Sequence, residues 1–270
     1  MFHLFWEPVV RPVLEAASPR VVVEVGARVG QTTERLLGLA SERDFELHVI
    51  DPATGPGFDP DALKGQHGGR FNFHSRMSLD QLPLIDEIDA VILDGDHNWY
   101  TVYNELKILR GQVERGRPYP LTFVHDIGWP YGRRDLYYDP DTIPAEHRQP
   151  YAKAGITLGN GELSGTEGLN VRLYHATTEG AAHSGVRTAV EDFLSEADLP
   201  IRFLVVDGFH GLGILAWEPA VAANPTLGAA LDRLESAEWL REHCRRLEEA
   251  RVRTLVRLRA ITRELQGRGA

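Results

Sequence analysis

Between about residues 20 and 127, short apolar runs rich in Val and Ile alternate with longer segments of helical periodicity. Runs without interspersed polar positions are typical of strands buried on both faces, and helices between such strands produce a parallel sheet covered on both sides. The pattern therefore predicts an α/β fold. The expected parallel strands are 20–26, 46–51, 70–75, 90–95 and 121–127.

The last sheet element has a different pattern. Residues 201–218 contain two apolar runs joined by a Gly-rich turn, which predicts an antiparallel hairpin. Together with the five earlier strands, the hairpin predicts a doubly wound, mostly parallel sheet of seven strands. The helices expected around it are 32–41, 98–114 and 186–196.

Two segments depart from this alternation. Residues 128–170 are rich in Gly, Pro, Tyr and Arg and have no clear period, which is typical of a functional lid. From about 226 to 266 the chain is expected to be helical, with leucines among many Arg and Glu residues. We therefore expect a helical segment over 1–19, a central domain over 20–222, and a C-terminal helix over 223–270 that serves oligomerisation.

Composition restricts the kinds of partner. The formal net charge of -10 argues against a nucleic-acid footprint, which needs clustered positive charge. Cys244 is the single cysteine, so an intramolecular disulfide is excluded and a cytoplasmic location is expected. No stretch approaches the length of a membrane span and the N-terminus lacks the pattern of a signal peptide, so no membrane association is expected.

The first candidate motif follows the first strand. Gly26 and Gly30 lie where a buried strand must turn into a helix, so a ligand could approach the backbone and the N–H groups of the helix. A tight turn without a ligand is the alternative. Arg28 breaks the dinucleotide fingerprint, which weakens the case for NAD or FAD. Glu24 would be a costly buried charge unless a polar or cationic group met it.

Asp51 follows the second strand, about 20–25 residues after the glycine turn. Doubly wound nucleotide-binding folds accept a ribose diol at this place. An Asp before Pro52 can also simply initiate a turn, so Asp51 alone leaves both interpretations open.

A second motif follows two later strands. Asp94 and Asp126 end strands that we expect to be adjacent, and such a pair can hold a hard cation such as Mg²⁺ through oxygen ligands. His97 has the intrinsic pKa of a general base. Asp96 is expected to cap the helix over 98–114 rather than bind a ligand. His125, beside Asp126, could be structural or functional.

Glu24-x-Gly26-x-x-x-Gly30, Asp51, Asp94 and the terminal hairpin together resemble class I S-adenosylmethionine-dependent methyltransferases. The resemblance covers 20–127 and 186–218, and it implies a Rossmann-like methyltransferase fold. It also implies S-adenosyl-L-methionine as cofactor, bound at its methionine end by the glycine turn, at its ribose by Asp51, and at its adenine by the residues after strand three. The implied cofactor-binding residues are Glu24, Gly26, Ala27, Gly30, Asp51, Met77, Ser78 and Asp94.

The second motif resembles metal-dependent O-methyltransferases, more closely the bacterial type that acts on sugars of natural products. The resemblance implies Mg²⁺ or another divalent metal on Asp94 and Asp126, with His97 as general base. His125 departs from the family pattern, which has an oxygen ligand there. It is therefore a third metal ligand, a second base, or a sign that no metal binds.

The acceptor implied by the resemblance is a small molecule, a sugar or glycoside hydroxyl. Two other functions stay open. Asp94 and Asp96 form an Asp-x-Asp pair, which also holds the metal of nucleotide-sugar glycosyltransferases, although that function leaves the glycine turn and the hairpin unexplained. The chain could also be a non-catalytic methyltransferase-like module that binds a nucleotide or a partner.

Overall fold

The computed structural model describes residues 2–159 and 161–267. The chain divides into two compact units, of which the first ends at Leu227 and the second begins at Gly228. Each unit is described by itself.

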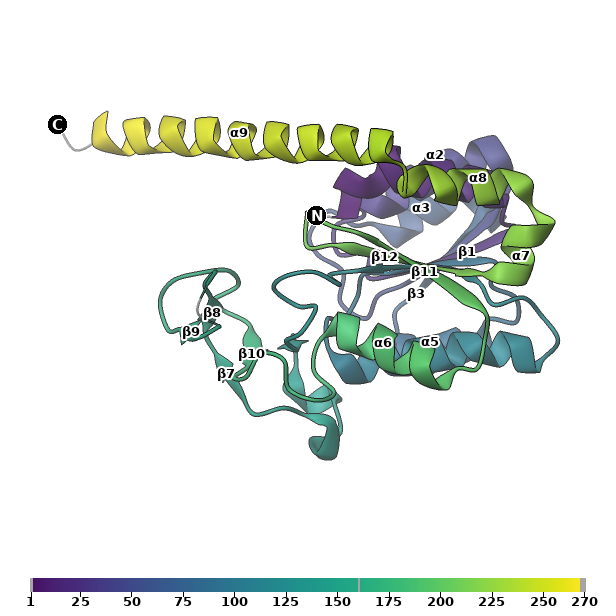
Figure 1. Cartoon of the computed structure of the whole chain (residues 1–270), viewed down its shortest axis with the longest axis horizontal. Coiled ribbons are helices and arrows are strands. Elements are labelled where there is room, and N and C mark those ends of the chain that lie inside the picture. The colour runs from purple at the N-terminus through teal and green to yellow at the C-terminus, as the bar shows by residue number, and fades with distance from the viewer. Residues whose placement is uncertain (1, 160, 268–270) are drawn as a thin grey trace. The chain divides into compact units, whose positions relative to one another are not determined.

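The first unit is built on a seven-stranded sheet with the order β11-β12-β5-β4-β1-β2-β3 (Figure 1). Six strands run in one direction, and β12 alone runs antiparallel, between β5 and β11. The doubly wound, Rossmann-like sheet with its antiparallel hairpin is therefore confirmed. The strands are β1 (Val21–Val25), β2 (Glu46–Ile50), β3 (Phe71–His74), β4 (Ala90–Leu93), β5 (Leu121–His125), β11 (Ile201–Val206) and β12 (Leu212–Trp217).

Helices cover both faces of this sheet, as the apolar runs require. Figure 1 shows α5 and α6 on one face and α2 and α3 on the other. The side chains of β4 are all buried between the two layers. The helices are α1 (Arg11–Ala17), α2 (Gln31–Arg43), α3 (Pro60–His67), α4 (Ser78–Gln81), α5 (Trp99–Glu114), α6 (Val186–Glu196) and α7 (Glu218–Ala223), with short turns η1 (Phe2–Phe5), η2 (Trp6–Val10), η3 (Gly68–Arg70) and η4 (Leu82–Leu84).

The start of α5 corrects one prediction. The cap is Asn98, whose side chain accepts from the backbone N–H of Thr101 at 2.8 Å, so the prediction that Asp96 caps this helix was wrong. Asp96 instead accepts from the hydroxyl of Thr101 at 3.1 Å. Asp135 adds a second acceptor for the helix, because its Oδ1 lies 2.7 Å from the N–H of Trp99.

The segment after β5 has no clear sequence period, yet it forms short strands and turns. Arg134 is fully buried and donates to the carbonyls of Ala176 and Gly161, and Asp135 also accepts from the N–H of Gly185, at the start of α6. The bonds of Arg134 hold the insertion together, and those of Asp135 join it to α5 and to the start of α6. Its strands form two small sheets. The strands are β6 (Leu136–Tyr137), β7 (Tyr151–Lys153), β8 (Gly155–Ile156), β9 (Leu163–Ser164) and β10 (Tyr174–Ala176). Two short helical turns, η5 (Pro140–Thr142) and η6 (Ala145–His147), lie between β6 and β7.

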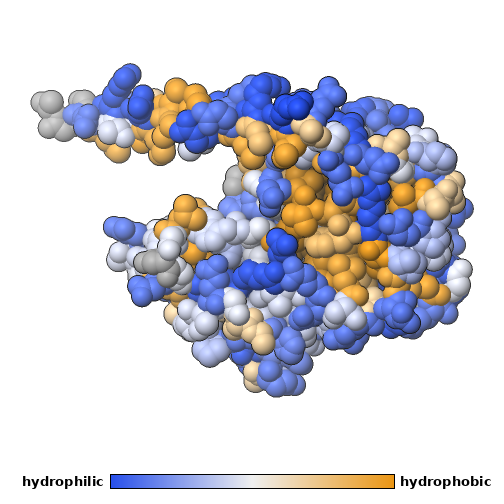
Figure 2. Space-filling view, viewed as in Figure 1, coloured by the Kyte–Doolittle hydropathy of each residue, from blue (hydrophilic) through white to orange (hydrophobic). Residues whose placement is uncertain are grey.

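Residues 225–267 are helical apart from the break at 235–236, as the sequence pattern of this segment predicts. One helix, α8 (Pro225–Leu234), ends at Leu234, and a second, α9 (Ala237–Gly267), runs for 31 residues. Several apolar side chains of α9 are exposed, and Figure 2 shows them as orange patches among blue charged ones. Within the described part of the chain, no helix is both long and apolar enough to cross a membrane.

Candidate active site

The candidate residues lie at the carboxyl ends of three neighbouring strands. β4 pairs with β1 on one side and with β5 on the other, all parallel. Glu24 is in β1, Asp94 directly follows β4, and Asp126 directly follows β5. The topology therefore brings residues 24, 94 and 126 to one edge, where open α/β sheets bind ligands.

The glycine turn is shaped by its neighbours in the fold. Gly26 has φ +90°, and a Cβ there would lie 2.3 Å from the carbonyl oxygen of Asp94. Gly30 has φ +82° and precedes α2, and its Cβ would lie 2.7 Å from the ring of Phe58. Both glycines are thus required by packing and backbone conformation, whether or not a ligand binds.

Glu24 is buried and only half satisfied. Its Oε2 accepts from the hydroxyl of Thr33 at 2.6 Å, whereas Oε1 has no hydrogen-bond partner among the described residues. Burial raises the pKa of Glu24 to about 8; the hydrogen bond from Thr33 opposes the shift and the charge of Asp94 adds to it. A buried carboxylate with a free oxygen is costly unless a cationic group meets it, so this residue fits the amino group of a ligand.

Asp51 organises the glycine turn. Its Oδ2 accepts from the N–H groups of Ala27 and Arg28, each at 2.8 Å, and its Oδ1 accepts from Ala53, also at 2.8 Å. Since a carboxylate oxygen can accept more than one hydrogen bond, a ribose hydroxyl could still be bound. The role of Asp51 toward a ribose stays a prediction.

The predicted adenine side reveals a residue that the motifs did not include. Met77 precedes α4, and the buried Ser78 forms a hydrogen bond with Glu105 of α5. Glu105 is buried, has one oxygen without a partner in the described chain, and burial raises its pKa to about 8. An acidic residue between the apolar positions Val102 and Leu109 was the only sequence signal for it. The contact of Met77 and Ser78 with adenine stays a prediction.

A metal could be held between β4 and β5. Ligand atoms of Asp94, His97 and Asp126 all lie within 4.8 Å of one another, and His97 Nε2 is 3.4 Å from Asp126 Oδ2. Asp126 Oδ1 is buried with no hydrogen-bond partner in the described part of the protein. Asp126 also has φ +60°, a conformation that is uncommon outside glycine and occurs often at functional sites. The orphaned oxygen and the donor set both fit a divalent cation.

His125 is placed differently from the other candidates. Its Nδ1 lies 2.8 Å from Asp94 Oδ1 and 2.9 Å from Asp126 Oδ2, and its Nε2 lies 3.1 Å from the carbonyl of Phe209. Burial alone would lower the pKa of His125, but the charges of Asp94 and Asp126 raise it to about 10. The ring is therefore an imidazolium that uses both nitrogens as donors, and this geometry does not favour the expected roles of metal ligand or base.

The imidazoles of His97 and His125 also shift the pKa of Asp126. Burial alone would raise the pKa of Asp126, but the charges of His97 and His125 hold it well below its usual range. The carboxylate of Asp126 is therefore ionised, as a metal ligand must be.

Aromatic side chains surround His97. The ring of Tyr131 stacks on it with centroids 5.6 Å apart, and Tyr138 approaches it at 5.9 Å. Two arginines of the insertion are engaged elsewhere: Arg134 is buried inside the insertion, and Arg133 pairs with Glu191 at 2.7 Å. The half-exposed Tyr138, beside His97, is more available to a substrate than either of them.

The Gly-rich turn between β11 and β12 was predicted from the sequence, but its contact with the site was not. Gly208, Phe209, His210 and Gly211 all have positive φ, from +48° to +86°. The carbonyl of Phe209 accepts from His125, and His210 Nδ1 lies 3.0 Å from the carbonyl of Trp129. Positive φ is unfavourable for Phe209 and His210 because of their Cβ atoms, so the turn is held by its surroundings and helps to fix His125.

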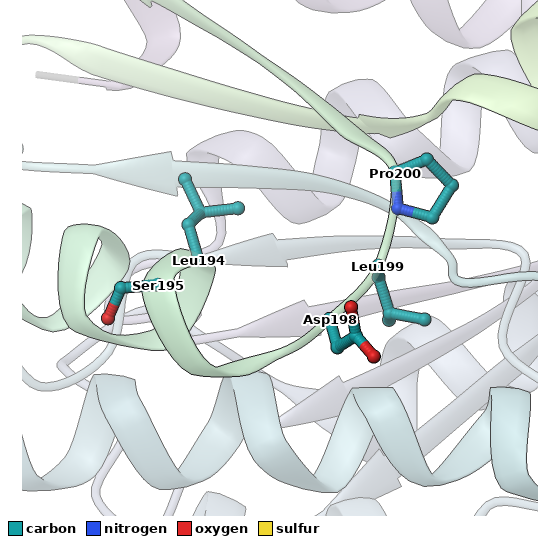
Figure 3. A pocket seen from close by; sticks show the side chains of 5 residues that line it. All are labelled: Leu194, Ser195, Asp198, Leu199 and Pro200. Carbon is teal, nitrogen blue, oxygen red and sulfur yellow. The ribbon is translucent and has the colours of Figure 1, made fainter.

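A surface hollow elsewhere is not part of this site. Figure 3 shows its five lining residues, which lie in the last turn of α6 and in the connection to β11. Since β11 is parallel to β5, its first residue lies at the amino edge of the sheet, opposite the carboxyl edge. The lining residues are Leu194, Ser195, Asp198, Leu199 and Pro200.

No protein-family model matches the chain, and no curated protein matches it. Solved structures with a similar arrangement include the S-adenosylhomocysteine-bound methyltransferase PaMTH1 of Podospora anserina, with 14% identity, a TM-score of 0.44, and coverage of 77% of this chain and 76% of that one. Another is the 1,6-didemethyltoxoflavin-N1-methyltransferase of Burkholderia thailandensis, with 17% identity and a TM-score of 0.40. That match covers 76% of this chain and 77% of the other one. The identities are low, so the case for a function rests on the site.

Proposed function

We propose that this chain is an S-adenosylmethionine-dependent O-methyltransferase assisted by a divalent metal. The observation that supports this most is a pair of buried carboxylate oxygens without partners in the described chain, Glu24 Oε1 and Asp126 Oδ1. They belong to β1 and to the residue after β5, with only β4 between these strands. Glu24 Oε1 suits the amino group of a cofactor and Asp126 Oδ1 suits a metal ion, so cofactor and metal would lie beside each other at the end of β4.

The cofactor side would be formed by the glycine turn and the strand ends beside it. Glu24 would accept from the amino group of S-adenosylmethionine, and the backbone of Gly26, Ala27 and Gly30 would line its methionine end. Asp51 would accept from the ribose hydroxyls while it continues to hold the turn. Met77, Ser78 and Asp94 would complete the cofactor site.

The metal side allows two arrangements that differ in the role of His97. If Asp94 and Asp126 hold Mg²⁺ through oxygen alone, His97 is free to act as the general base. If His97 completes the group with its imidazole, a metal softer than Mg²⁺ is favoured and the base must be another group. Either metal, when bound, would lower the pKa of an acceptor hydroxyl.

In the first arrangement, His97 would take the proton from the acceptor hydroxyl. S-adenosylmethionine, when bound, would supply the methyl group to the acceptor oxygen and leave as S-adenosylhomocysteine. Stacking on Tyr131 fixes the plane of the His97 ring, and much of the rate would come from such positioning. His125 would act as a positioning residue that holds Asp94 and Asp126 together.

The acceptor is proposed to be a small molecule with a sugar or glycoside hydroxyl. Trp129 is 37% exposed and Tyr138 is 52% exposed, which suits the flat faces of a sugar or aromatic ring. The single cysteine remains the support for a cytoplasmic location. The glycosyltransferase alternative is less favoured because Asp96 bonds to Thr101 and is not part of the possible metal-binding group.

Calorimetric titration of the purified chain with S-adenosylmethionine, NAD and UDP-glucose tests the proposal. S-adenosylmethionine should bind, and Glu24→Gln should weaken its binding at least tenfold because the amino group loses its anionic partner. Arg20→Gln, at the amino edge of the sheet, is the control and should leave binding unchanged. Binding of UDP-glucose or NAD alone would contradict the proposal, and cofactor binding without methyl transfer to any acceptor would favour the non-catalytic module.

A further inference from the structure

The long helix α9 has apolar side chains that the described part of the chain does not cover. Six of them are at least 40% exposed beyond residue 250, and Leu240 is 57% exposed. A helix of this length gains most of its stability from packing of an apolar face, so an exposed face is expected to have a partner. The six residues are Val252, Leu255, Val256, Leu258, Ile261 and Leu265.

A seam along α9 follows a coiled-coil repeat. Starting at Leu240, successive seam positions are separated by 4, 3, 4, 3, 4, 3 and 4 residues. This alternation is the a/d spacing of a heptad, which keeps one narrow stripe facing a second helix. The seam residues are Leu240, Cys244, Leu247, Arg251, Thr254, Leu258, Ile261 and Leu265.

The spacing of the seam residues is the same when it is counted from either end of the helix. Its spacing is symmetric about the midpoint between Arg251 and Thr254. When two copies of α9 are aligned antiparallel at this midpoint, each seam residue meets a seam residue of the other copy, and three of the four kinds of layer contain no charged residue. The layers are Leu240 with Leu265, Cys244 with Ile261, Leu247 with Leu258, and Arg251 with Thr254.

Charge favours the antiparallel orientation over the parallel one. A parallel pair would bury Arg251 against its own copy, whereas an antiparallel pair places it opposite Thr254. Arg251 is also bound by Glu248 of its own helix at 2.7 Å, which neutralises it beside the seam.

The charge of α9 is uneven along its length. Residues 250–263 carry five arginines and no acidic residue, whereas residues 237–249 carry four glutamates and three arginines. An antiparallel pair puts each strongly basic half beside a nearly neutral one, whereas a parallel pair puts the two basic halves side by side. Because like charges repel, this distribution favours the antiparallel pair.

We propose that α9 pairs with α9 of a second copy of this chain as an antiparallel two-stranded coiled coil about a two-fold axis. Such an interface is closed, since the same surface is used by both copies. The inference rests on the smaller unit alone and is independent of the proposed methyl transfer.

The orientation can be tested in the full-length chain by disulfide cross-linking with oxidised glutathione. In the proposed pair, Cys244 faces Ile261 of the other copy, so Ile261→Cys should produce a covalent dimer. The native chain should not cross-link, because its two Cys244 residues would be 17 positions apart, about 26 Å along the helix. The double variant Cys244→Ser with Ile261→Cys should not cross-link either. Cross-linking of the native chain would show a parallel pair and overturn the proposal.

Sedimentation tests the pairing without cysteine chemistry. The native chain should have twice the 30.2 kDa chain mass, and Leu258→Glu should give the single mass because it places a charge in the seam. Val256→Glu, on the opposite side of the helix, is the matched control and should leave the mass doubled. A native monomer at tens of micromolar, equal effects of the two variants, or an assembly that Ile261→Cys fails to cross-link would each overturn the proposal.

Discussion

His125 Nδ1 donates to Asp94 Oδ1 at 2.8 Å, and this contact ties the end of β5 to the residue after β4. The same nitrogen lies 2.9 Å from Asp126 Oδ2. The candidate metal ligands of the two strands are therefore held together by a third side chain, whose positive charge balances part of theirs.

Replacing His125 by Gln should destabilise the fold. The variant leaves two carboxylates beside one another without the buried charge between them, and loss of one partner of a buried pair typically costs about 3–5 kcal/mol. Urea unfolding at neutral pH measures the difference, with His67→Gln on α3 as a control that should change little. If both variants unfold at the same denaturant concentration, His125 does not hold the site together.

The same residue gives a pH dependence. The pKa of His125 is raised to about 10 from an ordinary value of 6.5, so its contribution to stability is complete below pH 6.5 and is lost as the pH rises through 10. The difference in unfolding free energy between the native chain and His125→Gln should therefore shrink between pH 6.5 and 10. A difference that grows over this range would contradict the charge assigned to the ring.

Glu105 predicts a second pH effect, away from the metal side. Burial raises its pKa to about 8 from 4.5, so the carboxyl group contributes most below pH 4.5, and that contribution is lost as the pH rises through 8. Between these values the native chain should lose up to about 1.4 kcal/mol per pH unit relative to Glu105→Gln, the equivalent of one proton. Unfolding curves of both proteins from pH 5 to 8 measure this, and parallel curves would show that Glu105 is ionised throughout.

The glycine turn offers a matched pair of substitutions. Gly26 and Gly57 both have φ near +90°, but a Cβ at Gly57 meets no atom within 4 Å, whereas one at Gly26 would overlap the carbonyl of Asp94. Gly57→Ala should lower the free energy of unfolding by about 1–2 kcal/mol, from backbone conformation alone. Gly26→Ala should lower it by about 1–3 kcal/mol more, because the added Cβ must displace Asp94. Thermal unfolding compares them, and equal losses would mean that the close approach to β4 is not needed.

His97 can be separated from its neighbours by activity and binding. His97→Ala should remove most methyl transfer and leave the affinity for S-adenosylmethionine nearly unchanged. If His97 is the base, the affinity for Mg²⁺ should also be retained. If His97 is a metal ligand, affinity for a softer ion such as Zn²⁺ should fall at least tenfold. Normal turnover of the variant would remove His97 from both roles.

The sequence predicts most of the sheet because strands such as β1 and β4 are continuous apolar runs that end at glycine or aspartate. The observed β4, Ala90–Leu93, lies inside the predicted 90–95, and the acidic residues at the strand ends were identified from the same pattern. The cap of α5 was harder to predict. Asp96 and Asn98 are both suitable cap residues, and only the backbone path into the helix selects Asn98.

The arrangement around His125 could not be predicted from the local sequence. His97 and His125 both neighbour acidic positions, and the difference between them comes from distant parts of the chain. The carbonyl of Phe209 fixes the far nitrogen of His125, and the rings of Phe2 and Phe5 lie 5.7 and 6.0 Å from it. The burial of Arg134 likewise depends on Ala176 and Gly161, which no local pattern connects to it.

The central claim is that a cofactor and a metal bind side by side at the ends of β1, β4 and β5. Crystals grown with S-adenosylhomocysteine and Mn²⁺ test it most directly, because manganese gives an anomalous signal. We predict one manganese peak between Asp94 and Asp126, and S-adenosylhomocysteine with its amino group on Glu24. Cofactor density away from Glu24, or no manganese peak beside Asp126 at saturating metal, would contradict the claim.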